Sequence, residues 1–232
     1  MILFLFEFGY ILQHLAVLFQ IIEITKKKNT EGVSLETILF FSIATFCRCI
    51  WMKDSMLSKY TLAYIEIVIA IGCLGYIIFL YKKYVVNDYL KHKIKIPIYF
   101  SFYVLLLLIF VLSFLFHPGK KNEYYLSIQM LVSGNIYSEC IGLLPQLYLI
   151  KKSSDTGNIS IYYLIFLGLA RFFRIFFWIK MFLQGKSFFS LIIADVLHTI
   201  LLSLFIYVFS KNKNSISLPT FSVPENQNRK IF

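Results

Sequence analysis

The sequence predicts an all-α membrane protein with seven transmembrane helices in a 3+1+3 bundle of two related halves. Three observations lead to this prediction: the composition, a series of apolar stretches and an internal repeat. Of the 232 residues, 59% are hydrophobic and 15% are charged, which is more apolar surface than a soluble domain hides. Spans of roughly 20 residues are expected near residues 2–24, 35–52, 60–80, 96–116, 124–150, 160–182 and 188–209.

Residues 18–51 and 144–177 align as two copies of one segment, offset by 126 positions. The matched pairs include Gln20–Gln146, Ser34–Ser160, Phe40–Phe166 and, inside apolar runs, Arg48–Arg174. The two copies begin an even number of crossings apart, so both halves enter the membrane in the same direction. We therefore expect a membrane domain over 1–209, with halves at about 2–80 and 124–209 and a connector helix at about 96–116.

Lysine and arginine gather on one side of the predicted membrane. That side comprises the loops after the first, third and fifth spans and the tail at 210–232, which is expected to be disordered. The positive-inside rule then predicts a lumenal or external N-terminus and a cytosolic C-terminus. The net charge of +11 is explained by cytosolic loops that face membrane lipids, which disfavours a nucleic-acid partner.

The sequence contains no pattern that is typical of an enzyme. It has no nucleophile with a suitably spaced base, no paired histidine ligands and no glycine-rich phosphate loop. The four cysteines lie in apolar stretches without metal-ligand spacing. We expect no catalytic activity, no cofactor and no metal site.

Three arginines lie inside predicted spans: Arg48, Arg171 and Arg174. Each costs about 2.5–3.5 kcal/mol at a helix centre, so each is expected to face the bundle interior. Arg171 and Arg174 share one helix face, and the repeat places Arg48 on the equivalent helix of the other half. Two interpretations are open: a positive pocket that binds carboxylates, or arginines that snorkel to the interface or form structural pairs.

His14 and Glu139 form a second candidate pair. The offset places Gln13, the neighbour of His14, opposite Glu139, so we expect the pair at a similar depth in the membrane. A histidine beside a carboxylate is a proton switch for the range of pH 5–8, and a satisfied core histidine is the alternative. Asp195 and Glu66 are further acids inside the spans, and the sequence does not identify their partners.

Three motifs carry a resemblance to a known family: LQHLAV at 12–17, YSECIGLLPQLYLI at 137–150 and ISIYYLIFLGLAR at 159–171. Over residues 6–220 the chain resembles the KDEL receptors, or ER lumen protein-retaining receptors, which are relatives of the PQ-loop and SWEET transporters. The resemblance implies a seven-helix receptor of the ER and Golgi membranes. It would capture lumenal proteins by a C-terminal tetrapeptide in the acidic Golgi and release them in the neutral ER.

The resemblance also implies roles for the residues that match the family pattern. Arg48 matches the carboxylate-binding arginine, Arg171 the central arginine of the sixth span, and Trp178 its tryptophan. His14 and Glu139 match the proton-sensing histidine and its carboxylate.

Against the pattern that the resemblance implies, several positions depart. Among them, Glu7 replaces an arginine, Trp51 an aspartate, Gln129 a glutamate and Arg174 a tyrosine, and Cys49, Ala170 and Met181 also differ. These changes remove acids that would bind a lysine and exchange one arginine for a glutamate. We expect a signal other than Lys-Asp-Glu-Leu, with an acidic residue opposite Arg174 and a basic or polar residue opposite Glu7.

The tail has two candidate retrieval signals. Lys211 and Lys213 resemble the family's tail lysines, and Arg229-Lys230 resembles a dibasic end that binds vesicle coat proteins; ordinary positive-inside charge is the alternative. Three functions stay open from the sequence. They are a divergent retrieval receptor for lumenal proteins, a small-solute transporter of the PQ-loop or SWEET type, and an orphan trafficking protein that has lost signal binding.

Overall fold

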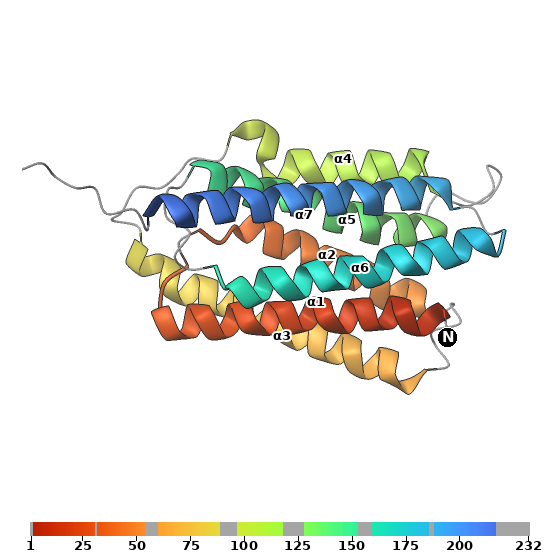
Figure 1. The fold of residues 1–232 in the computed structure, drawn as a ribbon, viewed down its shortest axis with the longest axis horizontal. Helices are drawn as coiled ribbons and strands as arrows, with labels where there is room; N and C mark the ends of the chain where they lie inside the picture. The colour runs from red at the N-terminus through yellow and green to blue at the C-terminus, as the bar shows by residue number, and fades with distance from the viewer. Residues whose placement is uncertain are drawn as a thin grey trace, which may run out of the picture.

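The computed structural model describes residues 2–30, 32–53, 60–88, 97–117, 128–152, 159–185 and 188–216, and every regular element within them is helical (Figure 1). The elements are α1 (Ile2–Lys27), α2 (Leu35–Met52), α3 (Thr61–Asp88), the 3-10 turn η2 (Ile98–Phe100), α4 (Phe102–Leu115), α5 (Ile128–Lys152), α6 (Ile161–Leu183) and α7 (Phe189–Ile216). They fall at the seven predicted stretches. Helix α7 continues seven residues beyond its expected end at 209, so the first part of the expected tail is helical, and residues 217–232 lie outside the described residues.

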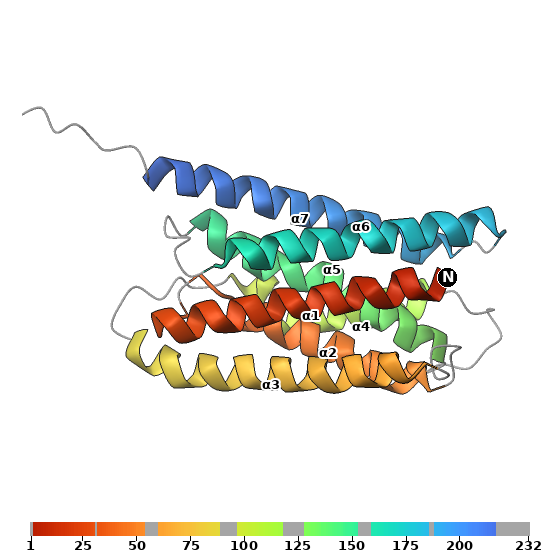
Figure 2. The same cartoon turned by 60° about the horizontal axis from the view of Figure 1, so that its bottom comes forward.

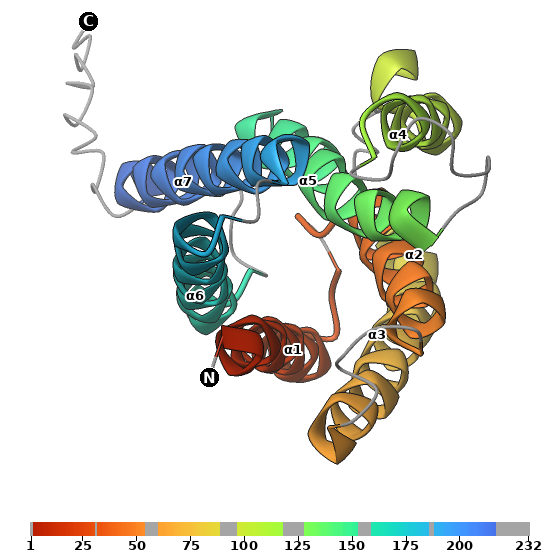
Figure 3. The same cartoon turned by 90° about the vertical axis from the view of Figure 1, so that its right-hand side faces the viewer.

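The long helices lie roughly side by side and alternate in direction along the chain (Figures 1 and 2). Viewed end-on, α3, α1, α6, α7, α5 and α2 follow one another around the bundle, and α4 lies outside it (Figure 3). Helix α1 packs most extensively on α6, and α2 on α5. The main contacts therefore join the first half of the chain to the second.

The outward faces of the helices are apolar. Phe4, Val68, Tyr103 and Leu183 are each more than half exposed, at 58%, 70%, 80% and 77%. Four helical segments in the described part of the chain are long and apolar enough to cross a membrane: Leu3–Lys27, Leu35–Met52, Thr61–Tyr84 and Phe189–Asn212. Helices α5 and α6 have 25 and 23 residues and carry polar residues that are buried inside the bundle. This distribution, apolar outside and polar inside, is typical of a helical membrane protein.

Two apolar cores lie along the bundle with a polar layer between them. One core includes Tyr10 and Phe177 and the other includes Ile24 and Leu164. Most of the buried polar side chains lie at sequence positions between the two cores, and Glu66 and Glu139 lie among the residues of the first: Gln13, His14, Arg48, Glu66, Glu139, Arg171, Arg174 and Asp195. The layer contains the three arginines, His14 and three of the acids that the sequence analysis found inside the predicted spans.

Two glutamines each form hydrogen bonds with the backbone of a turn in the other half of the chain. Each of these turns precedes a helix, α2 or α6. Gln146 accepts a hydrogen bond from the Ser34 backbone N–H at 2.8 Å and donates to the Gly32 carbonyl at 2.5 Å. Gly32 has a φ of 82°, a conformation that favours glycine. Gln20 accepts from the Ser160 N–H at 3.1 Å. Gln20 and Gln146 are matched by the sequence repeat, as are Ser34 and Ser160. The same hydrogen bond, from a serine N–H to a glutamine side chain, therefore occurs at two places that the repeat relates.

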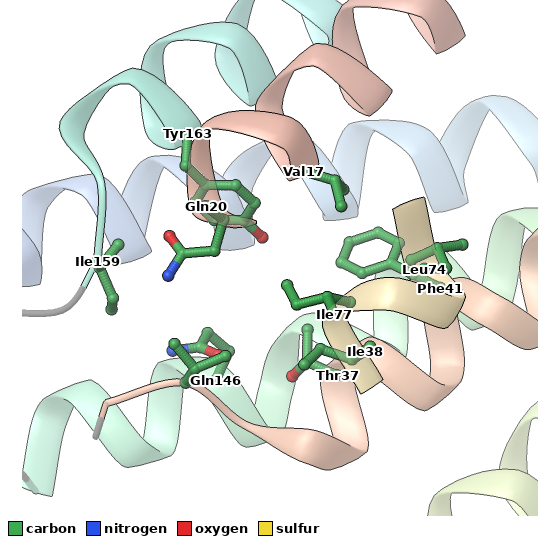
Figure 4. A pocket seen from close by; sticks show the side chains of 11 residues that line it. Val17, Gln20, Thr37, Ile38, Phe41, Leu74, Ile77, Gln146, Ile159 and Tyr163 are labelled. Carbon is green, nitrogen blue, oxygen red and sulfur yellow. The ribbon is translucent and has the colours of Figure 1, made fainter. Parts of the chain in front are cut away.

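A small cavity lies between these two glutamines (Figure 4). Its volume is about 30 Å³, which is room for one or two water molecules. Thr37 and Tyr163 add polar groups to a lining that is otherwise apolar. The lining contains none of the arginines, acids and histidine that the sequence analysis selected, which lie in the polar layer instead.

Helices α2 and α5 approach each other closely at Gly142. A Cβ atom on Gly142 would lie 2.6 Å from the Cβ of Phe40, whose side chain is fully buried. Because a contact this short forces one helix to shift, glycine is required at this crossing.

We expect Gly142→Ala to lower the melting temperature by about 3–10 °C, since overpacking costs about 1–3 kcal/mol. Gly168→Ala is the matched control because a Cβ there meets no atom within 4 Å and alanine favours the helix. Thermal unfolding of both purified variants in one detergent, followed by tryptophan fluorescence, tests this prediction. Equal stability of the two variants would contradict the close approach.

Candidate functional site

The polar layer contains all three arginines of the predicted spans in a buried position. The exposed fractions of Arg48, Arg171 and Arg174 are 2%, 1% and 0%. A buried guanidinium is tolerated only with acidic or hydrogen-bonding partners. Each arginine contacts at least one carboxylate from another helix, so the arginines do not snorkel to the interface.

The first group of charges, which we call the α6 cluster, comprises Arg171 and Arg174 on α6, Glu139 on α5 and Asp195 on α7. Arg171 Nη1 lies 3.1 Å from Glu139 Oε2 and 3.2 Å from Asp195 Oδ1. Arg174 Nε lies 3.0 Å from Asp195 Oδ2, and its Nη1 pairs with Glu139 Oε2. Two guanidinium groups thus face two carboxylates, and the cluster has no net charge when all four are ionised.

Two neutral side chains complete the α6 cluster. Gln13 on α1 accepts from Arg171 Nη2 at 2.8 Å and donates to Glu139 Oε1 at 3.3 Å. Trp178 donates its indole N–H to Asp195 Oδ2 at 2.6 Å. These bonds hold the side chains of α1, α5, α6 and α7 in fixed orientations, because a charge-assisted hydrogen bond is among the stronger contacts in a buried site.

The second group, the α2 cluster, comprises Arg48 on α2, Glu66 on α3, and His14 and Glu7 on α1. Glu66 pairs with Arg48 Nη2 through Oε2, and its Oε1 lies 2.7 Å from His14 Nδ1. The Glu7 carboxyl also faces Glu66 and Arg48. This cluster contains two acids and one guanidinium, so its charge balance depends on the protonation of His14 and Glu7.

Tyr10 lies between the two clusters. The Arg48 guanidinium carbon is 3.7 Å from the centre of the Tyr10 ring, and that of Arg174 is 5.1 Å from it. Both distances are in the range of cation–π contact. Asn135 on α5 donates to the Tyr10 hydroxyl at 2.9 Å. The two arginines that the repeat relates therefore converge on one aromatic side chain.

Several polar atoms of the layer have no hydrogen-bond partner among the described residues. They include Arg48 Nη1, Arg174 Nη2, Glu7 Oε1 and Trp51 Nε1. An unpaired buried donor or acceptor costs about 1–3 kcal/mol. The two free Nη groups are suited to a carboxylate, and the Glu7 oxygen is suited to a cationic or hydrogen-bond-donating group.

The predicted site residues meet in part as expected. Gln13 contacts Glu139, as the offset of 126 predicts, and Arg48 and Arg174 converge. The predicted positive pocket is not observed, because Glu66, Glu139 and Asp195 neutralise the arginines. His14 contacts Glu66, while the expected partner Glu139 is occupied by the α6 cluster.

The remaining predicted residues lie at the margin of the layer or outside it. Trp51 is buried at the end of α2, with its ring centre 6.3 Å from that of Phe6. Gln129 is half-buried in the first turn of α5, and no bond among the described residues joins its side chain to either cluster. Of the tail residues, Lys211 is exposed on α7, and the side chain of Lys213 and the dipeptide Arg229-Lys230 lie outside the described residues.

Sequence reasoning missed Tyr10 and Asn135 and left Glu66 and Asp195 without partners. A search for acids inside the spans found the last two, but only the packing of α3 and α7 assigns them to particular arginines. Tyr10 is one of 16 tyrosines and carries no signal of its own. Within the described residues, no group of three or more histidine, cysteine or acidic side chains is arranged to hold a metal ion.

We expect Asp195→Asn and Arg174→Gln each to lower the free energy of unfolding by about 3–5 kcal/mol, because each leaves a buried charge uncompensated. The double variant should lose about 1–3 kcal/mol less than the sum of the two losses. Denaturant unfolding in detergent measures all three variants. Glu23→Gln, which removes a surface pair with Lys27, is the control and should change the free energy of unfolding by less than about 1 kcal/mol. If the loss in the double variant equals the sum of the two single losses, the pairing of Asp195 with Arg174 is contradicted.

Comparison with known proteins identifies the family. A family model described as ER lumen protein retaining receptor matches residues 29–181. The ER lumen protein-retaining receptor 2 of Xenopus tropicalis is 31% identical over 204 residues, which cover 85% of this chain and 89% of the relative. The ER lumen protein-retaining receptor 3 of Danio rerio is 25% identical over 219 residues, with 91% and 95% covered.

A more distant relative gives the same result. The ER lumen protein-retaining receptor of Caenorhabditis briggsae is 22% identical over 196 residues, which cover 84% of this chain and 86% of the relative. All these relatives are receptors by name rather than enzymes, and the resemblance seen in the sequence motifs is confirmed. The chain belongs to the ER lumen protein-retaining receptor family.

Proposed function

We propose that this chain is a multi-pass receptor of the ER and Golgi membranes that binds the C-terminal retrieval signal of lumenal proteins, with altered signal specificity. Family membership supports the receptor role. The observation that carries the binding proposal is the convergence of Arg48 and Arg174 on Tyr10, each with one Nη group that has no partner among the described residues. Two guanidinium groups with free donors provide what a peptide's terminal carboxylate requires.

The proposed architecture is a seven-span bundle of two parallel halves. The paired bonds of Gln20 to Ser160 and of Gln146 to Ser34 support it, because they are related by the offset of 126. The packing of α1 on α6 and of α2 on α5 is related in the same way. A site between the halves is typical of proteins with this plan, and Tyr10 lies at such a place, between Arg48 of the first half and Arg174 of the second.

The proposed orientation follows the positive-inside rule, with a lumenal N-terminus and a cytosolic C-terminus. The α1 end that carries Lys26 and Lys27 and the α5 end that carries Lys151 and Lys152 then face the cytosol. Cytosolic lysines would contact anionic lipids. The tail, through Lys211, Lys213, Arg229 and Lys230, would bind vesicle coat proteins.

The proposed signal differs from Lys-Asp-Glu-Leu because the charged layer differs from the family pattern. Arg48 would bind the terminal carboxylate, and the free Nη2 of Arg174 would bind an acidic side chain of the signal. The unpaired oxygen of Glu7 would accept from a basic or polar side chain. Binding would be favoured by acid through His14, whose imidazole lies against a carboxylate.

Peptide binding to the purified full-length protein tests the receptor role. We expect members of a C-terminal tetrapeptide library to bind more tightly at about pH 5.5 than at pH 7.2, and their C-terminally amidated forms not to bind, because histidine changes charge between these values. Arg48→Ala should weaken binding at least about thirty-fold, since truncating one partner of a buried charge pair costs about 2 kcal/mol or more. Lys53→Ala, which removes an exposed cation one residue beyond α2, is the matched control.

Absence of binding by every free-carboxylate peptide would exclude the receptor role, and solute flux into proteoliposomes would then favour a transporter.

The same library tests the specificity. We expect the preference for an acidic residue to disappear in Arg174→Gln, and the preference for a basic residue to fall about tenfold or more in Glu7→Gln, which corresponds to one charge-assisted hydrogen bond. Affinity measured with peptides varied singly at the last four positions gives both results. Tight, acid-dependent binding of unmodified Lys-Asp-Glu-Leu would overturn the proposed specificity.

A further inference from the structure

The Asp195 carboxylate bonds to three side chains of a single neighbouring helix. Asp195 comes from α7 and is 1% exposed. Its Oδ1 lies 3.2 Å from Arg171 Nη1, and its Oδ2 lies 3.0 Å from Arg174 Nε and 2.6 Å from Trp178 Nε1. Because residues 171, 174 and 178 are three and four positions apart, their side chains share one face of α6. Two guanidinium groups and an indole N–H thus form a carboxylate-binding site, and Asp195 occupies it.

This site offers more donors than Asp195 uses. Arg171 Nε and Arg174 Nη2 are buried and have no hydrogen-bond partner among the described residues. The same is true of both ring nitrogens of His198, which is fully buried three residues after Asp195 on α7. Each arginine gives Asp195 one donor, whereas a guanidinium can direct two parallel N–H groups at one carboxylate. The donors therefore suit a second carboxylate that reaches them in another orientation.

The charge of the α6 cluster limits how many carboxylates it holds. Glu139 and Asp195 already neutralise the guanidinium groups of Arg171 and Arg174. A third carboxylate would leave a net negative charge in an interior of low polarity, which is unfavourable. An acid that enters from a ligand must therefore displace one of the two acids of the chain.

The bonding of the two acids indicates which one is displaced. Glu139 bonds to both arginines of α6 and also accepts from Gln13 on α1. Its helix α5 packs extensively on α2. Every described bond of the Asp195 carboxylate goes to α6 alone, and α7 packs on α6 less extensively than α1 does. Asp195 is therefore the acid with fewer attachments.

The contact between α6 and α7 is incompletely packed beside Asp195. A hollow of about 330 Å³ is lined by Ile175 of α6 and by Val196 and Thr199 of α7. Ile175 and Val196 directly follow Arg174 and Asp195 in the chain. From this region the two helices diverge toward the C-terminal end of α7 (Figures 1 and 2). Because few packing contacts are lost when closely spaced atoms are absent, a shift of Asp195 away from α6 has a low cost.

We infer that Asp195 is an internal competitor for the site where an acidic side chain of the retrieval signal binds, an inference that rests on the proposed receptor function for the identity of the ligand. The incoming acid meets the free Nη2 of Arg174 and then replaces Asp195 on the donors of α6. A ligand with an amide at that position leaves Asp195 in place, because an amide supplies no charge to balance the arginines. Asp195 thus lowers the affinity for acidic signals and sets the preference between acid and amide.

Peptide binding to the purified full-length protein tests the competition. The probes are two free-carboxylate tetrapeptides that differ by glutamate or glutamine at the position where the wild-type protein most favours an acid. Asp195→Asn removes the charge at nearly constant size, so we expect the preference for glutamate over glutamine to rise about tenfold or more, since like charges at one site are strongly unfavourable. Asp195→Glu keeps the charge and should keep the wild-type ratio within about threefold, as should the control Glu23→Gln, which lies outside the layer.

A second experiment tests the carboxylate site without any peptide. Asp195→Ala removes the occupant, and formate supplies a bare carboxylate. At ten times its dissociation constant, formate should raise the melting temperature of Asp195→Ala by about 2–4 °C. Pivalate at the same ionic strength, whose tert-butyl group is too bulky for the space, should leave it unchanged, and the wild-type protein should not respond to formate.

Formate also keeps the test usable if the variants fold poorly. If Asp195→Asn does not fold, Asp195→Ala purified in formate takes its place. There the same formate concentration should weaken binding of the glutamate peptide about tenfold by competition and leave the glutamine peptide within about threefold. Melting temperatures measured in one detergent identify the variants that fold.

The outcomes separate the inference from the receptor role. If formate stabilises Asp195→Ala no more than pivalate does, the carboxylate site on α6 is overturned, whatever the peptides do. If formate stabilises it but the wild-type protein and Asp195→Asn show the same ratio, the competition is overturned and the receptor role stands. If no free-carboxylate peptide binds the wild-type protein or any Asp195 variant, the receptor role is overturned, and with it the ligand assigned to this site.

Discussion

Charge pairing in a low-dielectric interior is the constraint on which this bundle depends. Three arginines lie at 2% exposure or less, and a guanidinium at that depth requires a carboxylate from a neighbouring helix. Arg48 on α2 forms an ion pair with Glu66 on α3. Arg174 on α6 forms ion pairs with Glu139 on α5 and Asp195 on α7. These pairs therefore define which helices are neighbours, whereas apolar contacts between Leu, Ile and Phe side chains permit many arrangements in lipid.

The pairing follows the internal repeat more closely than the sequence alignment alone suggests. The offset of 126 matches Arg48 with Arg174, and it carries Asp195 onto Ile69, which lies three residues after Glu66 on α3. In each half, then, the second helix supplies an arginine and the third helix supplies its acid. The acid has moved by one turn between the halves, which explains why a residue-by-residue alignment does not detect the correspondence.

Local pattern predicted the helices and the buried arginines, because each depends on composition or spacing within one segment. The partners were not predictable in the same way. Glu66, Glu139 and Asp195 are all acids in apolar runs, and the choice among them depends on helix rotation. The predicted positive pocket counted the arginines of two helices without the acids of three others, which lie on α3, α5 and α7. Tyr10 was missed because its role depends on two guanidinium groups from distant segments.

The two clusters differ in a way that assigns them different roles. The α6 cluster has two acids for two guanidinium groups, and Gln13 and Trp178 satisfy further atoms of it, so adding or removing a proton there breaks an existing balance. The α2 cluster has two acids for one guanidinium and a histidine whose charge is variable. The α6 cluster is therefore balanced among its own side chains, whereas the charge of the α2 cluster depends on whether Glu7 and His14 carry protons.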